Sequence, residues 1–297
     1  MSVIPLNYIE PVFRPPSEAG SLILQVTNGC SWNKCTFCEM YTAPQKKFKP
    51  KQEDEVLSEI KAVASSQPSV RRVFLADGDA MVLSYRRLHQ ILVWLNEYFP
   101  NLQRVSSYCL PRNIRNKTVA ELAELKSLGL DILYVGAESG DDLVLEKVQK
   151  GETQASTVDA LVKIKQAGLR SSVMILNGLG GRRYSEQHAV NSANMVNLAQ
   201  PDYLATLVVS FPLGEQRLRS GFDDFDMLNQ KELFREERLF LEHTDLSKTI
   251  FRSDHASNYL VLKGVLGRDK VAMLNKLDLA IDNPEMVPLR QEWQRGL

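Results

Sequence analysis

The chain has 297 residues, and its 44% hydrophobic and 24% charged content is typical of a globular protein rather than a disordered or fibrous one. Its 36 basic residues balance its 36 acidic ones, so the net charge gives no argument for binding nucleic acid or a membrane surface. No hydrophobic run approaches the ~20 residues that cross a bilayer, and few cysteines without an export signal predict a cytoplasmic protein.

Short hydrophobic runs alternate with amphipathic helical patterns from residue 21 to about residue 210. The predicted strands are residues 21–26, 70–75, 102–108, 131–135, 171–176 and 202–209. A capping-box pattern at Thr118 and Glu121 opens one of the intervening helices, and Gly129 suits its end. Another helix is expected to end near Gly168, and the next to begin at about Ser185.

Regular alternation of strand and helix predicts parallel strands joined by right-handed crossovers. Six such units favour an α/β fold with an open, partial (β/α)6 barrel over a closed barrel of eight units. Lys46, Lys47, Lys49 and Lys51 could form a local basic patch, but they are interpreted as a solvated loop.

The pattern changes after residue 211. A second capping box, at Asn229 and Glu232, opens a helix that runs to about His243. A strand at 249–252 and a helix near 269–281 follow. We therefore expect an N-terminal extension (1–20), a core barrel (21–210) and an α-rich C-terminal extension (211–297) packed on the barrel.

Three of the four cysteines, Cys30, Cys35 and Cys38, lie directly after the first predicted strand. Chemistry in such barrels sits at the C-terminal ends of strands. Three close thiols fit an iron–sulfur cluster that leaves one iron open. A structural zinc site is the alternative, but it needs a fourth ligand, and His89 and Cys109 are distant in sequence. A disulfide framework is disfavoured because one thiol of the triplet would be left over.

The triplet, its place after the first strand and the six βα units together resemble the radical S-adenosylmethionine (SAM) superfamily, over roughly residues 20–210. Phe37 stands where that family usually has an aromatic residue before the third cysteine. The resemblance implies that the three cysteines bind a [4Fe–4S] cluster whose open iron binds SAM. Reductive cleavage of SAM then gives a 5′-deoxyadenosyl radical that abstracts hydrogen from a substrate. The gap between Cys30 and Cys35 is four residues where the family commonly has three.

Further segments match the same family. After the second strand, where the family has a Gly-rich motif whose acid holds the SAM amino group, stand Asp77, Gly78 and Asp79. Residues 136–140 (GAESG) and 150–153 (KGET) resemble a segment of the branch that includes tRNA methylthiotransferases and anaerobic coproporphyrinogen oxidases. This resemblance implies that Glu138 approaches the SAM ribose or methionine end and that Lys150 pairs with the SAM carboxylate.

Four more residues are weaker candidates. Ser106 is predicted to hydrogen-bond SAM or substrate, or simply to be a polar strand end, and the turn that begins at Asn177 is predicted to lie near adenine. Cys109 is a candidate for giving a hydrogen atom to a substrate radical, with a small buried hydrophobe as the alternative. His255 lies in a polar segment and is a candidate substrate contact, with a structural role as the alternative.

The leading hypothesis is a radical SAM enzyme that acts on an unidentified substrate and needs a flavodoxin- or ferredoxin-like electron donor. The balanced charge favours a small-molecule substrate over nucleic acid, and no membrane contact is expected. One alternative is a zinc-stabilised, non-catalytic interaction protein. Another is a radical SAM enzyme acting on tRNA, disfavoured because residues 211–297 contain no basic run interleaved with aromatics. The sequence leaves the oligomeric state open.

Overall fold

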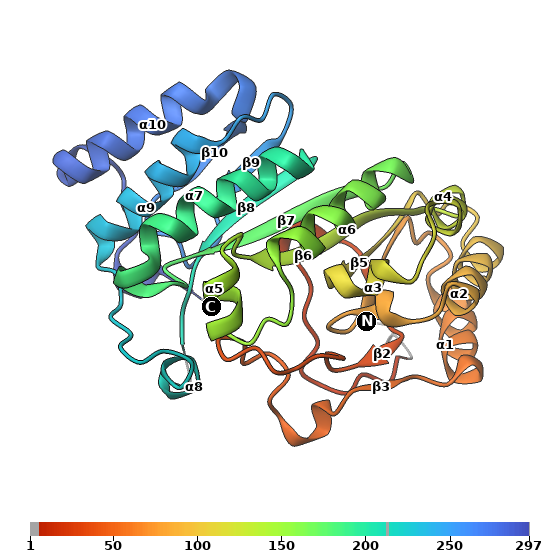
Figure 1. Cartoon of the computed structure of the whole chain (residues 1–297). Coiled ribbons are helices and arrows are strands. Elements are labelled where there is room, and N and C mark those ends of the chain that lie inside the picture. Colours follow the sequence, from red (N-terminus) through yellow and green to blue (C-terminus); the bar gives the residue numbers. More distant parts are fainter. Residues whose placement is uncertain (1–5, 212–213, 297) are drawn as a thin grey trace. The chain divides into compact units, whose positions relative to one another are not determined.

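The computed structural model, drawn in Figure 1, describes residues 6–211 and 214–296. These residues form two compact units. The first unit contains residues up to Asn33, Cys38–Val135 and Lys163–Ser171. The second contains Lys34–Phe37, Gly136–Val162 and the residues from Ser172 onward. The chain therefore passes between the units several times, and each unit is built from segments distant in sequence.

Four parallel strands form the sheet of the first unit, in the order β1 (Leu22–Gln25), β4 (Arg72–Ala76), β5 (Arg104–Cys109) and β6 (Leu130–Glu138). The last three residues of β6 belong to the second unit. Val73, Phe74, Leu75 and Ala76 are all fully buried, as expected for a parallel strand covered on both faces. Gln25 pairs with Ala76, so the loops that follow β1 and β4 leave the sheet side by side.

The helices of the first unit are α1 (Glu53–Ser66), α2 (Tyr85–Tyr98), α3 (Pro111–Arg115) and α4 (Val119–Ser127). Helices α1 and α2 pack side by side (Figure 1). The predicted capping box of α4 is present, because the Thr118 N–H donates to the Glu121 carboxylate at 2.7 Å and the Glu121 N–H donates to the Thr118 hydroxyl at 3.1 Å. A short antiparallel pair, β2 (Thr27–Asn28) and β3 (Lys49–Pro50), was not expected from the sequence.

The sheet strands of the second unit are ordered β7 (Arg170–Asn177), β8 (Tyr203–Val208), β9 (Ile250–Ser253) and β10 (Leu262–Val265). Strands β7, β8 and β9 are parallel, and β10 is antiparallel to β9. All six predicted barrel strands are thus present within a few residues of their expected ends. In the C-terminal extension, the strand predicted at 249–252 is β9, whereas β10 was not expected; its four residues are too few for a hydrophobic pattern to stand out.

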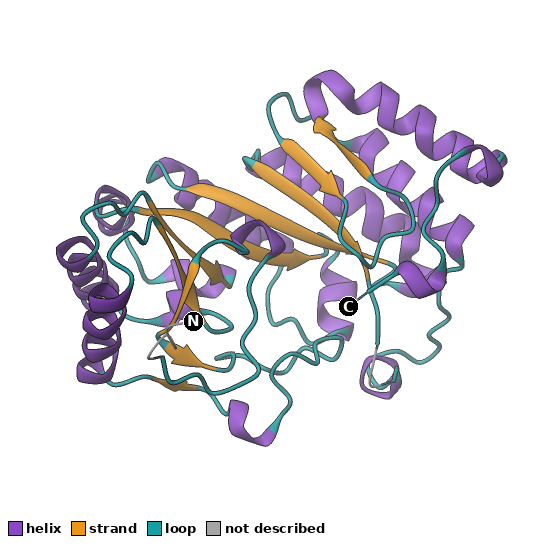
Figure 2. Cartoon of the chain, turned by 180° about the vertical axis from the view of Figure 1, so that it is seen from behind, coloured by secondary structure: helices purple, strands orange, loops and turns teal. Residues whose placement is uncertain are grey.

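The helices of the second unit include α7 (Gly181–Ala199), α9 (Gln230–His243) and α10 (Leu266–Asp282), and α9 packs against both of the others. Figure 2 shows these helices beside the strands of their unit. Helix α7 begins four residues before the predicted Ser185. The other α-helices of the chain are α5 (Asp142–Lys147), α6 (Gln154–Gln166) and α8 (Gln216–Arg219). The 3-10 turns are η1 (Pro16–Glu18), η2 (Pro44–Lys46), η3 (Ala80–Val82), η4 (Pro284–Met286) and η5 (Glu292–Gln294).

One helix predicted from the sequence is divided into two helices in the structure. The sequence indicates a single helix ending near Gly168, but α5 and α6 are separated by a turn in which Gln149 and Gly151 have φ of 52° and 70°. Left-handed backbone at these positions cannot continue a right-handed helix. Lys150 lies in this turn, between the two helices, and pairs there with Glu138.

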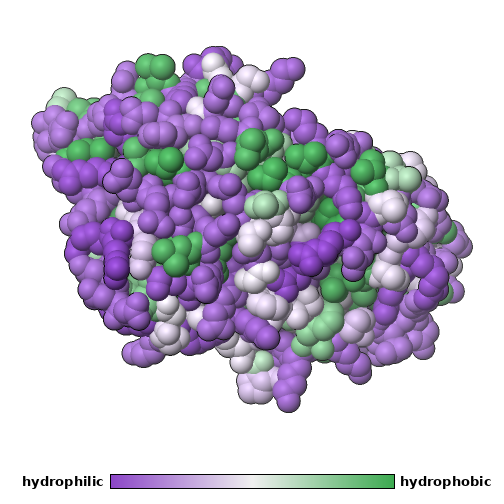
Figure 3. All heavy atoms as spheres, viewed as in Figure 1, coloured by the Kyte–Doolittle hydropathy of each residue, from purple (hydrophilic) through white to green (hydrophobic). Residues whose placement is uncertain are grey.

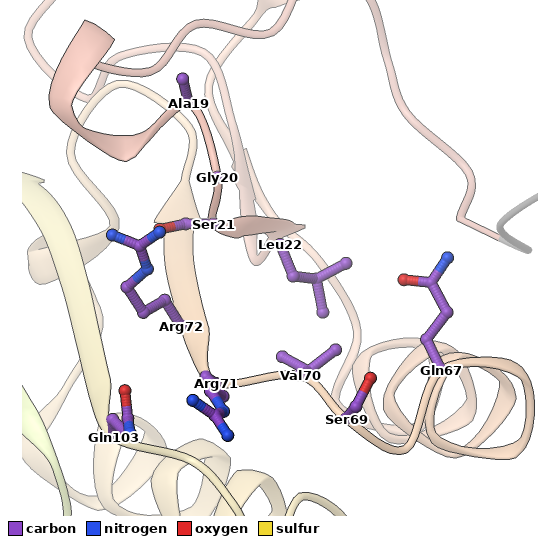
Figure 4. Close-up of a pocket in the computed structure, with 10 residues that line it drawn as sticks. All are labelled: Ala19, Gly20, Ser21, Leu22, Gln67, Ser69, Val70, Arg71, Arg72 and Gln103. Atoms are coloured by element: carbon purple, nitrogen blue, oxygen red, sulfur yellow. The ribbon is translucent and has the colours of Figure 1, made fainter.

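Figure 3 shows hydrophobic residues as separate patches in a mostly hydrophilic face. No helix in the described ranges is long and hydrophobic enough to cross a membrane. A cavity of about 600 Å³ in the first unit is lined by residues that include Ser21, Leu22, Arg71 and Arg72 (Figure 4). These residues lie at the N-terminal ends of β1 and β4, the opposite edge of the sheet from the cysteine motif.

Candidate functional site

The cysteine loop begins at Gly29, a position that only glycine can occupy. Gly29 has φ of 69°, and a Cβ there would lie 2.2 Å from the carbonyl oxygen of Lys46. The preceding side chain, Asn28, donates to the carbonyl oxygens of Gln45 at 2.7 Å and Lys47 at 3.0 Å. Residues 45–47 therefore fix the direction in which the chain reaches Cys30.

Gly78 lets the turn after β4 lie directly against the first cysteine. A Cβ at Gly78 would come within 2.9 Å of both the Cβ of Cys30 and the Tyr41 ring. Any side chain at this position would displace the cysteine loop. The glycine of the predicted Asp77-Gly78-Asp79 motif is thus explained by close packing on Cys30.

Asp79 holds the residue that follows Cys30. Its buried carboxylate accepts hydrogen bonds from the Ser31 N–H at 2.8 Å, from the Ser31 hydroxyl and from the Asn113 amide at 3.3 Å. Burial raises the pKa of Asp79, and the hydrogen bonds from Ser31 oppose that rise. The structure places this carboxylate on the cysteine loop, and its contact with the SAM amino group stays a prediction.

Three of the four residues between Cys30 and Cys35 belong to the first unit, and each of them makes a specific contact there. Besides Ser31 on Asp79, the Trp32 ring lies 3.9 Å from the Arg112 guanidinium carbon. The Asn33 side chain donates to the Tyr41 carbonyl oxygen at 2.9 Å. The additional residue of this loop is therefore accommodated by specific contacts.

Asp77 forms an ion pair with Lys46, and both side chains are fully buried. Burial raises the pKa of the Asp77 carboxyl, and the hydrogen bond and positive charge of Lys46 oppose the rise. The interpretation of Lys46 as part of a solvated loop is therefore wrong. Sequence reasoning missed it because nothing in a run of lysines shows which one turns inward. Asn113, which contacts Asp79, was also missed.

Ser106 and Cys109 both lie on β5. Ser106 pairs with Phe74 and Ile132, in the middle of the strand rather than at its end. Its hydroxyl is fully buried and has no hydrogen-bond partner among the described residues. Cys109 is also buried, and its thiol lies 3.3 Å from the carbonyl oxygen of Leu110.

The second unit brings Glu138 and Lys150 together. Their side chains form an ion pair with Nζ and Oε1 3.1 Å apart, and they are 12% and 4% exposed respectively. Glu138 has φ of 67°, and a Cβ at Gly136 would lie 2.2 Å from its Oε1. The Lys150 Nζ also lies 5.8 Å from the centre of the Phe37 ring. Three residues that the family resemblance singled out therefore meet in one place.

The segment that carries Cys35 is fixed by contacts that the sequence did not indicate. The Thr36 N–H donates to the carbonyl oxygen of Val148 at 3.0 Å, and Arg217 donates to that of Cys35 at 3.2 Å. Phe37 packs against the hydrophobic cluster that includes Val144 and Val148. Helices α5 and α8 thus hold this part of the cysteine motif.

The remaining candidates also lie in the second unit. Asn177 is buried at the end of β7, and its carbonyl oxygen accepts from the Val209 N–H at 2.9 Å. Gly178 follows with φ of 84°, and its N–H donates to Glu236 at 2.6 Å. His255 is half-buried with Nδ1 2.9 Å from the Ser257 hydroxyl, and burial lowers its pKa.

None of the four cysteines forms a disulfide. Cys30 and Cys38 are assigned to the first unit and Cys35 to the second. Within the ranges that the structure describes, no group of three or more His, Cys, Asp or Glu side chains is placed to hold a metal ion. The role of the three cysteines as metal ligands therefore stays a prediction from the sequence.

The sequence profile of the radical SAM superfamily matches residues 24–196. The chain belongs to the radical SAM superfamily. This is a family of enzymes that use a [4Fe–4S] cluster and SAM and need a reductant. The predicted family is confirmed, whereas the branch within it is not specified.

Two curated relatives show how much of the chain is shared. The heme chaperone HemW of Bacillus subtilis is 21% identical over 166 residues, which are 54% of this chain and 43% of HemW. A putative methylthiotransferase of Methanocaldococcus jannaschii is 23% identical over 160 residues, which are 52% of this chain and 34% of that protein. The alignments cover less than half the length of either relative.

Solved structures confirm the partial-barrel fold. Coproporphyrinogen III oxidase (HemN) of Escherichia coli, a radical SAM enzyme, has a TM-score of 0.55 at 14% identity, over 75% of this chain and 52% of its own. Methylornithine synthase (PylB) has a TM-score of 0.51 at 17% identity, over 91% and 83% of the two chains. The predicted α/β class with mostly parallel strands is therefore confirmed.

Proposed function

We propose that this chain carries out radical SAM chemistry, with Cys30, Cys35 and Cys38 binding a [4Fe–4S] cluster whose fourth iron binds SAM. When bound together, the cluster and SAM would supply the radical chemistry of the family, with hydrogen abstraction from the substrate as its outcome. The observation that carries the proposal is the cysteine loop itself. It follows β1 directly, and Gly78 and Asp79 pack on it from the neighbouring strand end.

The surrounding residues fit such a group. Gly78 keeps side chains away from Cys30, and the buried Ser106 hydroxyl, in the middle of β5, has no partner among the described residues. A buried hydroxyl without a partner costs on the order of 1–3 kcal/mol, so a ligand atom that accepts its hydrogen bond would remove that cost. The packing of Gly78 on Cys30 supports a site at the C-terminal ends of β1 and β4.

We assign the remaining site residues by the chemistry that each can offer. Glu138 and Lys150 present a carboxylate and an ammonium next to Phe37, and these charges suit the ribose hydroxyls and carboxylate of SAM. Asp77 and Asp79 border the cysteine loop and carry the charge that the SAM amino group needs. The backbone of the turn after Asn177 offers hydrogen bonds to adenine. Cys109 and His255 are kept as the weaker candidates for contact with substrate.

The activity of the whole protein is part of the same proposal. We propose a small-molecule substrate, a flavodoxin- or ferredoxin-like electron donor and a cytoplasmic setting, within the methylthiotransferase and coproporphyrinogen oxidase-like branch. The names of HemN and the putative methylthiotransferase support that branch. We also propose the division into an N-terminal extension (1–20), a core (21–210) and a C-terminal extension (211–297).

The test is anaerobic reconstitution with iron and sulfide, followed by reductant and SAM. The wild-type protein is expected to show the EPR signal of a reduced [4Fe–4S] cluster and to release 5′-deoxyadenosine. Cys35→Ala should lose both, whereas Cys109→Ala, which removes a buried thiol outside the motif, should keep the cluster signal. Absence of the signal in the wild type would overturn the proposal. Stoichiometric zinc without iron–sulfur absorbance would instead support the zinc-stabilised interaction protein.

A further inference from the structure

Two adjacent carboxylates of α9, Glu236 and Glu237, are both buried but hold different parts of the second unit. Glu236 accepts hydrogen bonds from the Gly178 N–H at 2.6 Å and from the Ser185 hydroxyl at 2.5 Å. Glu237 accepts from the Thr206 hydroxyl at 2.8 Å, on β8. Glu236 therefore binds the turn after β7, whereas Glu237 binds the interior of the next strand.

Glu236 also reaches the turn after β6, through His188 on α7. The His188 Nε2 lies 3.8 Å from the Glu236 Oε1, and its Nδ1 lies 2.8 Å from the Ser139 hydroxyl. Ser139 in turn accepts from the Asp141 N–H at 3.0 Å, which closes the turn. Ser139 directly follows Glu138, so a continuous chain of contacts joins α9 to the site.

The order Ser139, His188, Glu236 is similar to that of a hydrolase triad, but the exposure of the residues excludes nucleophilic catalysis. The Ser139 and His188 side chains are 0% and 1% exposed, and the serine hydroxyl is already occupied by two neighbours. A nucleophile must reach its substrate. The network therefore has a structural role, which is to bind backbone N–H groups of the protein itself.

Such a network is costly to bury. Burial raises the pKa of the Glu236 carboxyl, and the neighbouring His188 and the hydrogen bonds from Ser185 and Gly178 oppose that rise. Well-packed hydrophobic residues of similar size would serve stability as well or better. What this network adds is a unique position for the backbone groups that it binds, namely the Gly178 N–H and the turn around Ser139.

We propose that Glu236 is a positioning residue of the SAM site, which fixes the turn after β7 directly and the turn after β6 through His188. The inference rests on the proposed function, because these turns carry Asn177 and Glu138. It also gives the C-terminal extension a role: α9 begins at Gln230, beyond the 24–196 segment that matches the family. A segment outside the family match would thus complete the cofactor site.

The test compares Glu236→Leu with Glu237→Leu, since each variant removes one buried carboxylate from the same helix. Equilibrium binding of SAM to the reconstituted protein should be about tenfold weaker in Glu236→Leu, for the loss of a hydrogen bond to a charged group, and within about twofold of wild type in Glu237→Leu. Glu236→Gln should partly restore affinity, because its amide oxygen can still accept from Gly178. Hydrogen exchange of residues 138–141 and 177–181, which needs no cofactor, should accelerate only when Glu236 is changed.

Equal SAM affinity and equal exchange in the two leucine variants would overturn the inference while leaving wild-type SAM binding, and hence the proposed function, intact. A wild type that binds no SAM would overturn both. If Glu236→Leu does not fold, His188→Gln is the substitute, because it cuts the link to Ser139 and leaves the contact with Gly178. It should accelerate exchange at 138–141 but not at 177–181.

Discussion

The buried carboxylate of Asp79 accepts a hydrogen bond from the Ser31 N–H at 2.8 Å, one residue after Cys30. The turn after β4 thereby controls the loop after β1. Asp79→Ala is expected to leave the Ser31 N–H without its partner and to loosen the loop. Loss of a hydrogen bond of this charged kind should speed cluster loss to a chelator by about tenfold, measured as the decay of iron–sulfur absorbance.

Asp131→Ala is the control for this prediction, because Asp131 is also a hydrogen-bonded aspartate of the first unit but its partners are Arg170 and Lys126, not the cysteine loop. Equal rates of cluster loss in the two variants would show that Asp79 does not stabilise the cysteine loop.

The ion pair of Lys150 with Glu138 is predicted to support SAM binding. Lys150→Met removes the ammonium group and leaves Glu138 nearly buried without this partner. We expect SAM affinity to fall at least about tenfold, as measured by equilibrium dialysis. Lys147→Met is the matched control in α5, since Lys147 faces the exposed Asp223 at 3.9 Å. A similar affinity in both variants would remove Lys150 from the site.

Lys46 and Asp77 form a fully buried pair, so breaking it from one side is expected to be expensive. Lys46→Met should lower the free energy of unfolding by about 3–5 kcal/mol, because Asp77 is left buried and unpaired. Urea denaturation under anaerobic conditions measures the change. Arg86→Ala breaks the exposed pair with Glu53 and should cost less than about 1 kcal/mol. The double variant Lys46→Met, Asp77→Leu should recover most of the loss; no recovery would contradict an electrostatic cause.

Glu237 is predicted to make stability depend on pH. Burial raises its pKa from 4.5 to about 7, so the folded state favours the neutral carboxyl. That contribution is present below the ordinary pKa and is lost as pH rises through about 7. Glu237→Gln should therefore become more stable relative to wild type between about pH 5 and pH 8, by on the order of 3 kcal/mol.

Glu232, on the same helix, is the control, because its pKa is shifted in the opposite direction from that of Glu237. Its hydrogen bonds with Arg182 and the Asn229 N–H lower its pKa, so its contribution is lost only as pH falls through that lowered value. Between about pH 5 and pH 8, the free energy of unfolding of Glu232→Gln should differ from that of wild type by a constant amount.

If the free energy of unfolding of Glu237→Gln also differed from that of wild type by a constant amount over this range, the prediction for Glu237 would be contradicted.

Local patterns were sufficient for much of the fold. Six strands, namely β1, β4, β5, β6, β7 and β8, follow from the short hydrophobic segments, and α4 and α9 begin at the two capping boxes that the sequence shows. These features depend on residues within a few positions of one another. The division between α5 and α6 was missed because it depends on left-handed backbone at Gln149, and a glutamine in the sequence does not indicate that conformation.

By itself the sequence determined the family and the cysteine motif, because the thiols are close in the chain and their spacing and position after the first strand are legible there. Only the tertiary structure decided what surrounds them. It turned Lys46 inward to Asp77, set Asp79 on Ser31 and joined Glu236 to Ser139 through His188. The physical reason is that a buried polar group must find a partner, and packing of distant segments, not sequence neighbours, determines which partner is within reach.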